Sequence, residues 1–311
     1  MNNKLFRLAI LFLYVLTTNA VAANYVSSVN AYQEGKNIVI TYQLSKQTDI
    51  KVSVSTDGGK NFSTLKKVIG DVGKDIKKGD KNITWRVLEE FEKFDYDNVC
   101  FKVEEFFTEN GHEYVDLGLP SGTLWATCNV GATKPEEYGD YFAWGETLPK
   151  DKYNDLTYKW TNTHNGLAKY CTDTELYYSK IDYKTTLDLA DDVANVNWGD
   201  NWRIPTKTEL QELIDYCTWT IISKNGIKGQ IAIGPNGNSI FFPYAGYYID
   251  LDLSVGFIGF YWSSTLYTKG SFSAYIIAIS NKLECNKFYR GYGLPVRPVM
   301  SRKSGKSYRS K

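Results

Sequence analysis

Alternating apolar and polar residues predict β-strands through the first third of the chain. Apolar residues occupy every second position from Lys36 to Leu44, and Asp49–Ser55 repeats the pattern. Two more short runs of this kind cover Asn82–Val87 and Val99–Glu105. Glycine-containing turns separate these runs, so residues 25–107 are predicted to form an all-β sandwich of immunoglobulin-like size.

One turn in this region carries a recognisable motif. Residues 55–62 (STDGGKNF) fit the Asp-box pattern, in which the carboxylate of Asp57 accepts backbone N–H bonds and a glycine takes positive φ. Sialidases carry several such boxes, whereas a single copy in a short domain is typical of a turn device. The whole stretch resembles the β-sandwich modules that precede other domains in secreted proteins of gut Bacteroidetes.

The composition changes after a polar connector expected at Thr108–Tyr114, and residues 115–299 are predicted to form an α+β domain. Thr206 and Glu209 form a capping box ahead of an apolar stripe, which predicts a helix of about ten residues ending near Cys217. Other elements expected in this domain are a helix at Leu187–Ala194 and strands at Ser239–Phe242, Tyr261–Ser264 and Ala274–Ser280.

The two ends of the chain are predicted to lie outside the folded domains. Residues 1–22 have the features of a secretory signal peptide: basic Lys4 and Arg7, a short apolar core, and small residues at Ala20 and Ala22. The protein is therefore expected to be exported to the cell surface or medium, with the periplasm as an alternative. No transmembrane segment is expected, and residues 300–311 are predicted to be a disordered basic tail.

Composition narrows the function classes. The 311 residues include 36 Lys and Arg against 35 Asp and Glu, a net charge of +1, which offers no general field for nucleic acid. Two histidines leave little for multi-histidine metal sites or catalytic triads. The GxSxG, HExxH, P-loop and GxGxxG motifs are absent from the sequence. These observations disfavour a nucleic-acid partner and the common catalytic classes.

Seven short motifs in the second domain occur in the order found in one known family. They are residues 115–122 (VDLGLPSG), 125–132 (WATCNVGA), 137–146 (EYGDYFAWGE), 198–206 (WGDNWRIPT), 242–247 (FPYAGY), 261–264 (YWSS) and 296–299 (VRPV). The domain thus resembles the Fibrobacter succinogenes major paralogous domain and the related C-terminal domain of the Legionella collagen-like protein.

This resemblance implies a C-type-lectin-like fold, which the formylglycine-generating enzymes share, and an exported, surface-facing protein. Adhesion or glycan binding is the activity that it suggests. The expected function is recognition without catalysis, and the partner is a glycan, the extracellular matrix or a cell-surface protein. The alternatives are an enzyme acting on exported proteins or polysaccharides, and a structural subunit of a surface assembly. The sequence leaves the oligomeric state open.

The candidate binding surface is the long loop between two of these motifs, from Tyr247 to Phe260. Lectin-like folds commonly present ligands on such a loop, and here it carries Tyr248, Asp250 and Asp252. Tyr289 and Tyr292 are added as aromatic faces that could stack on sugar rings or protein surfaces. The alternative is an ordinary exposed loop.

Carboxylates suggest two further possibilities. Asp188, Asp191 and Asp192 are spaced to share one helical face and could contribute to a calcium site, although a solvated helix end is the simpler interpretation. The Glu-Pro-Asn and Gln-Pro-Asp motifs of calcium-dependent lectins are absent, so no cofactor is expected. Acid pairs for glycoside cleavage could come from Glu136, Glu137, Asp140 and Glu146.

The remaining expectations concern the interior. Five cysteines cannot all pair, and Cys128 with Cys217 is the candidate disulfide, with five buried thiols as the alternative. Arg203 and Arg297 are expected to be buried and paired with acids such as Glu146 or Glu209. Scaffold positions are expected for the motif tryptophans Trp125, Trp144, Trp202 and Trp262.

Overall fold

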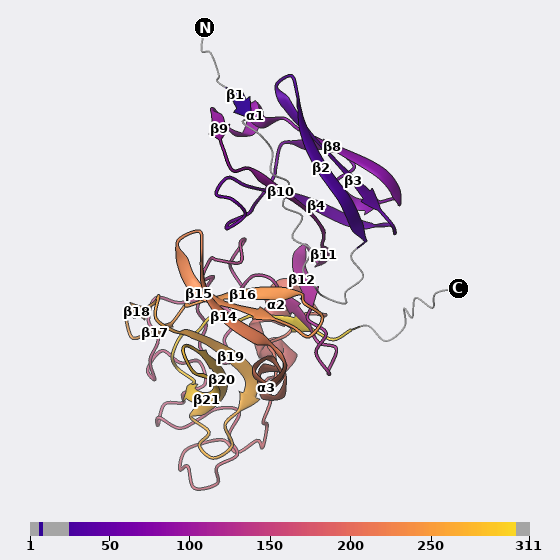
Figure 1. Cartoon of the computed structure of the whole chain (residues 1–311). Coiled ribbons are helices and arrows are strands. Elements are labelled where there is room, and N and C mark those ends of the chain that lie inside the picture. The colour runs from indigo at the N-terminus through magenta and orange to yellow at the C-terminus, as the bar shows by residue number, and fades with distance from the viewer. Residues whose placement is uncertain (1–5, 9–24, 303–311) are drawn as a thin grey trace, which may run out of the picture. The chain divides into compact units, whose positions relative to one another are not determined.

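The computed structural model describes residues 6–8 and 25–302, and the chain is mostly β-structure, as expected (Figure 1). It divides into two compact units, Met1–Phe107 and Thr108–Lys311. Apart from residues 6–8, the predicted signal peptide lies outside the described residues, as does the predicted basic tail beyond Arg302. Within the described ranges no helix is long and apolar enough to cross a membrane.

In its described residues the first unit is a β-sandwich of two four-stranded sheets, with a separate two-stranded pair, β1-β9. One sheet has the strand order β2-β3-β8-β6, with bounds Val26–Glu34, Asn37–Leu44, Gly79–Trp85 and Val68–Gly70. The other runs β10-β4-β5 with β7 also on β4, and its bounds are Cys100–Glu105, Thr48–Ser55, Ser63–Thr64 and Gly73–Ile76. The short elements are α1 (Val87–Glu90), β9 (Phe94–Tyr96) and β1 (Phe6–Leu8), which pairs with β9.

One hydrophobic core joins the inner faces of the two sheets. It takes Ile38 and Ile40 from β3, Val52 from β4, and Trp85 from β8. Ile38 and Ile40 are two residues apart, so their side chains point to the same face of the sheet. The four strands expected in this region are confirmed, except that β8 ends at Trp85 because the chain turns into α1.

The Asp-box turn between β4 and β5 is confirmed. Asp57 Oδ1 accepts bonds from the backbone N–H groups of Lys60 (3.1 Å) and Asn61 (2.9 Å), and Ser55 Oγ donates to the same oxygen. Gly58 and Gly59 have φ of +75° and +86°, a region that favours glycine. The hydrogen bonds, led by the one from Ser55, lower the pKa of Asp57 to about 2.

As far as Arg302, the last residue described, the second unit contains four small sheets and three short helical elements. The sheets are β11-β12-β13-β22 (Phe107–Glu109, His112–Asp116, Leu124–Ala126, Val299–Met300), β14-β15-β16 (Thr218–Lys224, Ile227–Ile233, Ser239–Pro243), β17-β18 (Tyr247–Ile249, Asp252–Ser254) and β19-β20-β21 (Gly259–Leu266, Ser273–Ile279, Leu283–Tyr289). The helical elements are η1 (Leu189–Asp191), α2 (Val193–Trp198) and α3 (Lys207–Tyr216).

Most expected elements of this unit are confirmed, and two are corrected. The capping box of Thr206 and Glu209 begins α3, and β16, β19 and β20 fall where alternation placed strands. The polar connector at Thr108–Tyr114 is instead part of a hairpin, turning at Asn110-Gly111 between β11 and β12. The earlier helix starts later than expected, since Asp192 caps α2 by accepting bonds from Ala194 and Asn195.

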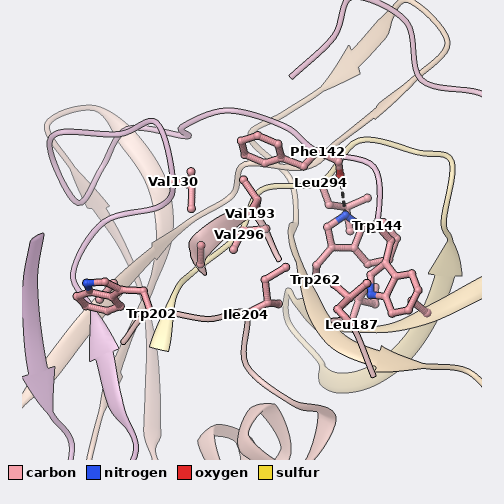
Figure 2. Close-up of a cluster of buried hydrophobic side chains, with 14 of the residues drawn as sticks. Val130, Phe142, Trp144, Leu187, Val193, Trp202, Ile204, Trp262, Leu294 and Val296 are labelled. Atoms are coloured by element: carbon pink, nitrogen blue, oxygen red, sulfur yellow. Dashed lines mark hydrogen bonds between the residues drawn. The ribbon is translucent and has the colours of Figure 1, made fainter. Parts of the chain in front are cut away.

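The main core of the second unit collects side chains from segments far apart in the sequence. Figure 2 shows Phe142 and Trp144 beside Trp262 and Leu294, with Val130 to their left in the same cluster. The Trp262 indole N–H donates to the Phe142 carbonyl at 2.7 Å, and that of Trp144 donates to the Ser263 carbonyl at the same distance. The four motif tryptophans are almost fully buried, as expected for scaffold residues.

We expect Asp57→Ala to lower the free energy of unfolding of the first unit by about 1 kcal/mol, because it removes the acceptor of several turn hydrogen bonds. Asp97→Ala is the matched control, since Asp97 is exposed and its side chain makes no hydrogen bond within the described residues. Urea unfolding followed by far-UV circular dichroism measures both. Equal stabilities of the two variants would contradict the assigned role of the turn.

The Arg203–Glu209 pair predicts a specific pH dependence. Burial alone would raise the pKa of Glu209, but the bonds from Arg203 dominate and lower it to about 2. The unfolded value is near 4.5, so the pair stabilises the fold fully above pH 4.5 and loses this contribution as the pH falls toward 2. The contribution is about 3 kcal/mol.

Glu209→Gln should therefore remove this part of the pH dependence, whereas Glu175→Gln at an exposed position should retain it. Tryptophan fluorescence reports the second unit, because every tryptophan except Trp85 lies there. Parallel curves of stability against pH for Glu209→Gln and the unmodified chain would contradict the assignment.

Candidate functional site

A long stretch of the second unit has no helix or strand. From Thr127 to Asp188, all of it described, the chain forms turns and isolated β-bridges only, and we call this stretch the irregular segment. It still follows one defined path, because buried side chains hold it to the strands around it. Two buried arginines supply several of these attachments.

Arg290 fastens the middle of the irregular segment. Its guanidinium donates to the Tyr158 hydroxyl (2.9 Å) and to the carbonyls of Tyr170 (2.9 Å), Ser271 (2.7 Å) and Lys169 (3.1 Å). It also lies 4.8 Å from the ring centroid of Trp144. The side chain is 1% exposed, so the carbonyls and rings replace its water shell.

Arg297 holds the start of the irregular segment in the same way. Its guanidinium donates to Asn129 Oδ1 (2.8 Å) and to the carbonyls of Ala126, Thr127 and Phe241. Burial lowers the pKa of Arg297 below its ordinary value. The expectation that Arg297 pairs with an acid is wrong, since within the described chain no carboxylate lies within ion-pair distance of it. Carbonyl oxygens and the side-chain oxygen of Asn129 accept its hydrogen bonds instead.

The expected pairing of Arg203 with Glu209 is confirmed. Two bonds of 2.5 and 2.7 Å join the guanidinium to the carboxylate, which also accepts from Thr123 and Thr206. Glu209 lies at the start of α3, so this pair fixes the helix to the extended chain before it. Its role is structural.

Tyr248, the first candidate binding residue, faces inward. The expected loop from Tyr247 to Phe260 contains the β17-β18 hairpin, and Tyr248 lies on β17. Its ring contacts those of Tyr141 and Tyr153 at centroid distances of 5.8 and 5.2 Å, and it is half-buried. Tyr248 therefore packs the base of the hairpin against the irregular segment and is partly exposed.

Asp250, at the tip of the hairpin, contacts the irregular segment. Its carboxylate accepts bonds from Asn154 Nδ2 (2.8 Å) and Lys152 Nζ (3.2 Å), and its backbone pairs with Tyr153 in both directions. Asp250 has φ of +55°, an unusual backbone conformation for a residue other than glycine. Asp252, two residues on, is exposed, and within the described residues its side chain makes no hydrogen bond.

Tyr289 lines a pocket that the sequence did not indicate. The pocket measures about 290 Å³, and we call it the aromatic pocket; its lining residues are Asp155, Thr161, Asn165, Phe272 and Tyr289. Tyr292, in contrast, is half-buried against Phe288 and Tyr289 at centroid distances of 5.6 and 5.2 Å. Tyr292 thus supports Tyr289 from behind.

Residues 153–155 connect the predicted residues to the pocket. Tyr153 pairs with Asp250, Asn154 bonds the Asp250 carboxylate, and Asp155 lines the pocket together with Tyr289. Burial raises the pKa of Tyr289 above its ordinary value, and the Asp155 carboxylate raises it further. The structure therefore brings Asp250 and Tyr289 to one short turn, while Tyr248 and Tyr292 lie behind it as support.

The three aspartates considered for calcium are engaged elsewhere. Asp191 accepts from Lys169 (2.6 Å) and from the Tyr170 hydroxyl (2.6 Å), and Asp188 pairs with Lys169 and Lys184. Asp192 caps α2, and burial raises its pKa to about 6. In the part of the chain described, no group of three or more His, Cys, Asp or Glu side chains is arranged to hold a metal ion.

The acids considered for glycoside cleavage are mostly separate structural acceptors. Glu136 accepts from Asn225, and Glu137 accepts backbone bonds from Thr133 and Lys134. Glu146 binds Lys150 Nζ (2.9 Å) and the Lys159 backbone N–H (2.7 Å). Asp140 is exposed. Since three of the four acids hold different turns together, the residues do not form a facing pair.

All five cysteines are free thiols in the structure, so Cys128 and Cys217 are not joined. Burial raises the pKa of Cys217 and of Cys285 to about 11. A thiol with so high a pKa is mostly protonated at neutral pH and reacts slowly. Cys100 and Cys171 are buried, whereas Cys128, Cys217 and Cys285 are partly exposed, so the expectation of five buried thiols holds for two of them.

The sequence did not predict that Phe272 and residues of the irregular segment line a pocket. It also did not predict that Arg290 anchors this segment. Asp155 and Asn165 lie where no periodic pattern exists, so only the fold brings them together. Comparison of the chain with models of protein families, with curated proteins and with solved structures finds no match.

Arg290→Met should destabilise the second unit by about 3 kcal/mol or more, because it leaves the carbonyls of Lys169, Tyr170 and Ser271 without their hydrogen-bond donor. Trypsin should then cut the native chain faster after Lys180 and Lys184, which are exposed in the irregular segment.

Lys282→Met is the control for Arg290→Met, since it removes an exposed surface ion pair and should cost little. Urea unfolding by tryptophan fluorescence and timed trypsin digestion test both variants. An Arg290→Met chain as stable and as resistant as the control would refute the anchoring role.

Proposed function

We propose that the protein is an exported, non-enzymatic recognition protein that acts outside the cell or at its surface. In this proposal the first unit is an immunoglobulin-like spacer, and the second has a C-type-lectin-like fold whose loops bind a glycan, the matrix or a cell-surface protein. The predicted leader and the seven motifs support this assignment. Each contact would be weak, and several copies on one surface would add avidity.

The aromatic pocket is the observation that carries the proposal. Two rings and three polar side chains converge on it from segments that lie far apart in the sequence. Arg290 joins the irregular segment to the wall residue Phe272, because its guanidinium bonds the carbonyls of Lys169 and Tyr170 while its backbone N–H donates to the Phe272 carbonyl at 3.0 Å. A site held this firmly loses little conformational entropy when a ligand binds.

Catalysis and assembly are less well supported. The candidate acids Glu136, Glu137 and Glu146 are committed to different turns. In the first unit, the edge strand β2 carries a bulge between Ser27 and Asn30, and bulges oppose edge-to-edge pairing. These features favour recognition by the loops of the second unit.

The proposal predicts specific binding on an array of glycans and matrix proteins. Tyr289→Ala should abolish the signal, and Asp250→Ala should weaken it severalfold, because Asn154 and its neighbour Asp155 lose a positioning contact. Asp252→Ala is the matched control on the same hairpin and should bind normally. The signal should persist in EDTA.

A blank array would contradict recognition of glycans and matrix. Equal loss of binding in Asp250→Ala and Asp252→Ala would show that the contact between Asp250 and Asn154 does not position the binding site. Loss of binding in EDTA would require a metal in the site.

A further inference from the structure

The aromatic pocket is small and has one apolar wall. Phe272 and Tyr289 are parallel within 6°, with centroids 6.3 Å apart, in the range of offset-stacked rings. Both are half-buried and line the pocket, so part of each ring is accessible from it. The volume, about 290 Å³, lies just below the range of about 300–1,000 Å³ typical of drug-sized ligands. It suits a single ring.

The rest of the lining is polar and comes from the irregular segment. Asp155 supplies a carboxylate, Thr161 a hydroxyl and Asn165 a side-chain amide. Within the described residues the side-chain amide of Asn165 makes no hydrogen bond. The backbone of Asn165 has φ of +59°. The Asp155 carboxylate, which raises the pKa of the neighbouring Tyr289 hydroxyl, has lone pairs that can accept from a ligand donor. The polar lining thus offers both donors and acceptors.

We propose that the aromatic pocket is a subsite for one pyranose ring of a neutral glycan. The ring's apolar C–H face would lie on Phe272 and Tyr289, and its hydroxyls would bond Asp155 and Asn165. This inference rests on the recognition function proposed above and names the ligand class. It requires no metal ion, because the protein atoms themselves supply the hydrogen bonds.

Charge and shape argue against other ligands. Asp155 is the one charged residue among the five that line the pocket, which disfavours an anion. A cation would meet only two rings in parallel planes and an exposed carboxylate, and exposed ion pairs contribute little. Hydroxyls each donate and accept, which matches an amide, a hydroxyl and a carboxylate side by side.

Ligand-observed saturation-transfer NMR on the full chain tests the proposal. The probes are the methyl glycosides of glucose, galactose, mannose, fucose and N-acetylglucosamine, with tetramethylammonium as a cation probe. At least one glycoside should bind with a millimolar dissociation constant, and tetramethylammonium should not bind.

Variants locate the binding site. Phe272→Leu keeps an apolar side chain of similar volume but removes the flat face, so affinity should fall at least tenfold. Asp155→Asn should weaken binding about fivefold, because a charge-assisted bond becomes a neutral one. Tyr289→Phe keeps the wall and should bind within threefold. Phe257→Ala, at a side chain 84% exposed in the loop after β18 and outside the pocket lining, is the control and should bind normally.

The outcomes separate this inference from the recognition function. Glycoside binding that Phe272→Leu leaves intact, binding of tetramethylammonium alone, or no glycoside binding at millimolar concentration each overturns the subsite. If the chain still binds an arrayed ligand, and Phe272→Leu does not change that signal, only the subsite is refuted. If neither glycosides nor the array bind, both proposals are refuted.

Discussion

Two buried guanidinium groups, those of Arg290 and Arg297, fix the path of the second unit's irregular segment. Moving an ion out of water costs several kcal/mol, so a buried arginine is stable only where oxygens surround it. Here these oxygens are backbone carbonyls, a hydroxyl and an amide, with no carboxylate within ion-pair distance among the described residues. Any rearrangement that removed these oxygens would leave a bare charge in the core.

This constraint explains how the irregular segment, residues 127–188, can build a site without helices or strands. Loops usually move more than the elements they connect, and a binding site on a moving loop loses entropy when it closes. Arg290 removes much of that motion by holding Lys169 and Tyr170 with its side chain and Phe272 with its backbone. This anchoring supports the proposal of a preformed aromatic pocket.

Local signals predicted the elements that depend on neighbouring residues. The capping box of α3 and the Asp box each act within a few residues, and both formed as expected. The hairpin at Asn110-Gly111 was not predicted although Asn-Gly is a strong turn signal, because the residues beside it are mostly polar and lack the alternation typical of strands.

Long-range contacts were not predictable in the same way. Arg297 was expected to pair with an acid, since a sequence cannot show that carbonyls from distant segments will surround a side chain. The pocket was missed for a similar reason, because Asp155 and Phe272 are more than one hundred positions apart. Of the candidate residues, Tyr289 alone lines the pocket, and Asp250 reaches it through Asn154.

Amide hydrogen exchange on the native chain tests the central claim most directly. The backbone N–H groups of Ala168, Lys180 and Asp182 bond to carbonyls within the irregular segment. If the buried arginines hold this segment rigid, these amides should exchange within about tenfold of the rates of amides in β19 and β20. Exchange near the rates of an unfolded peptide would show a mobile segment and contradict a preformed site.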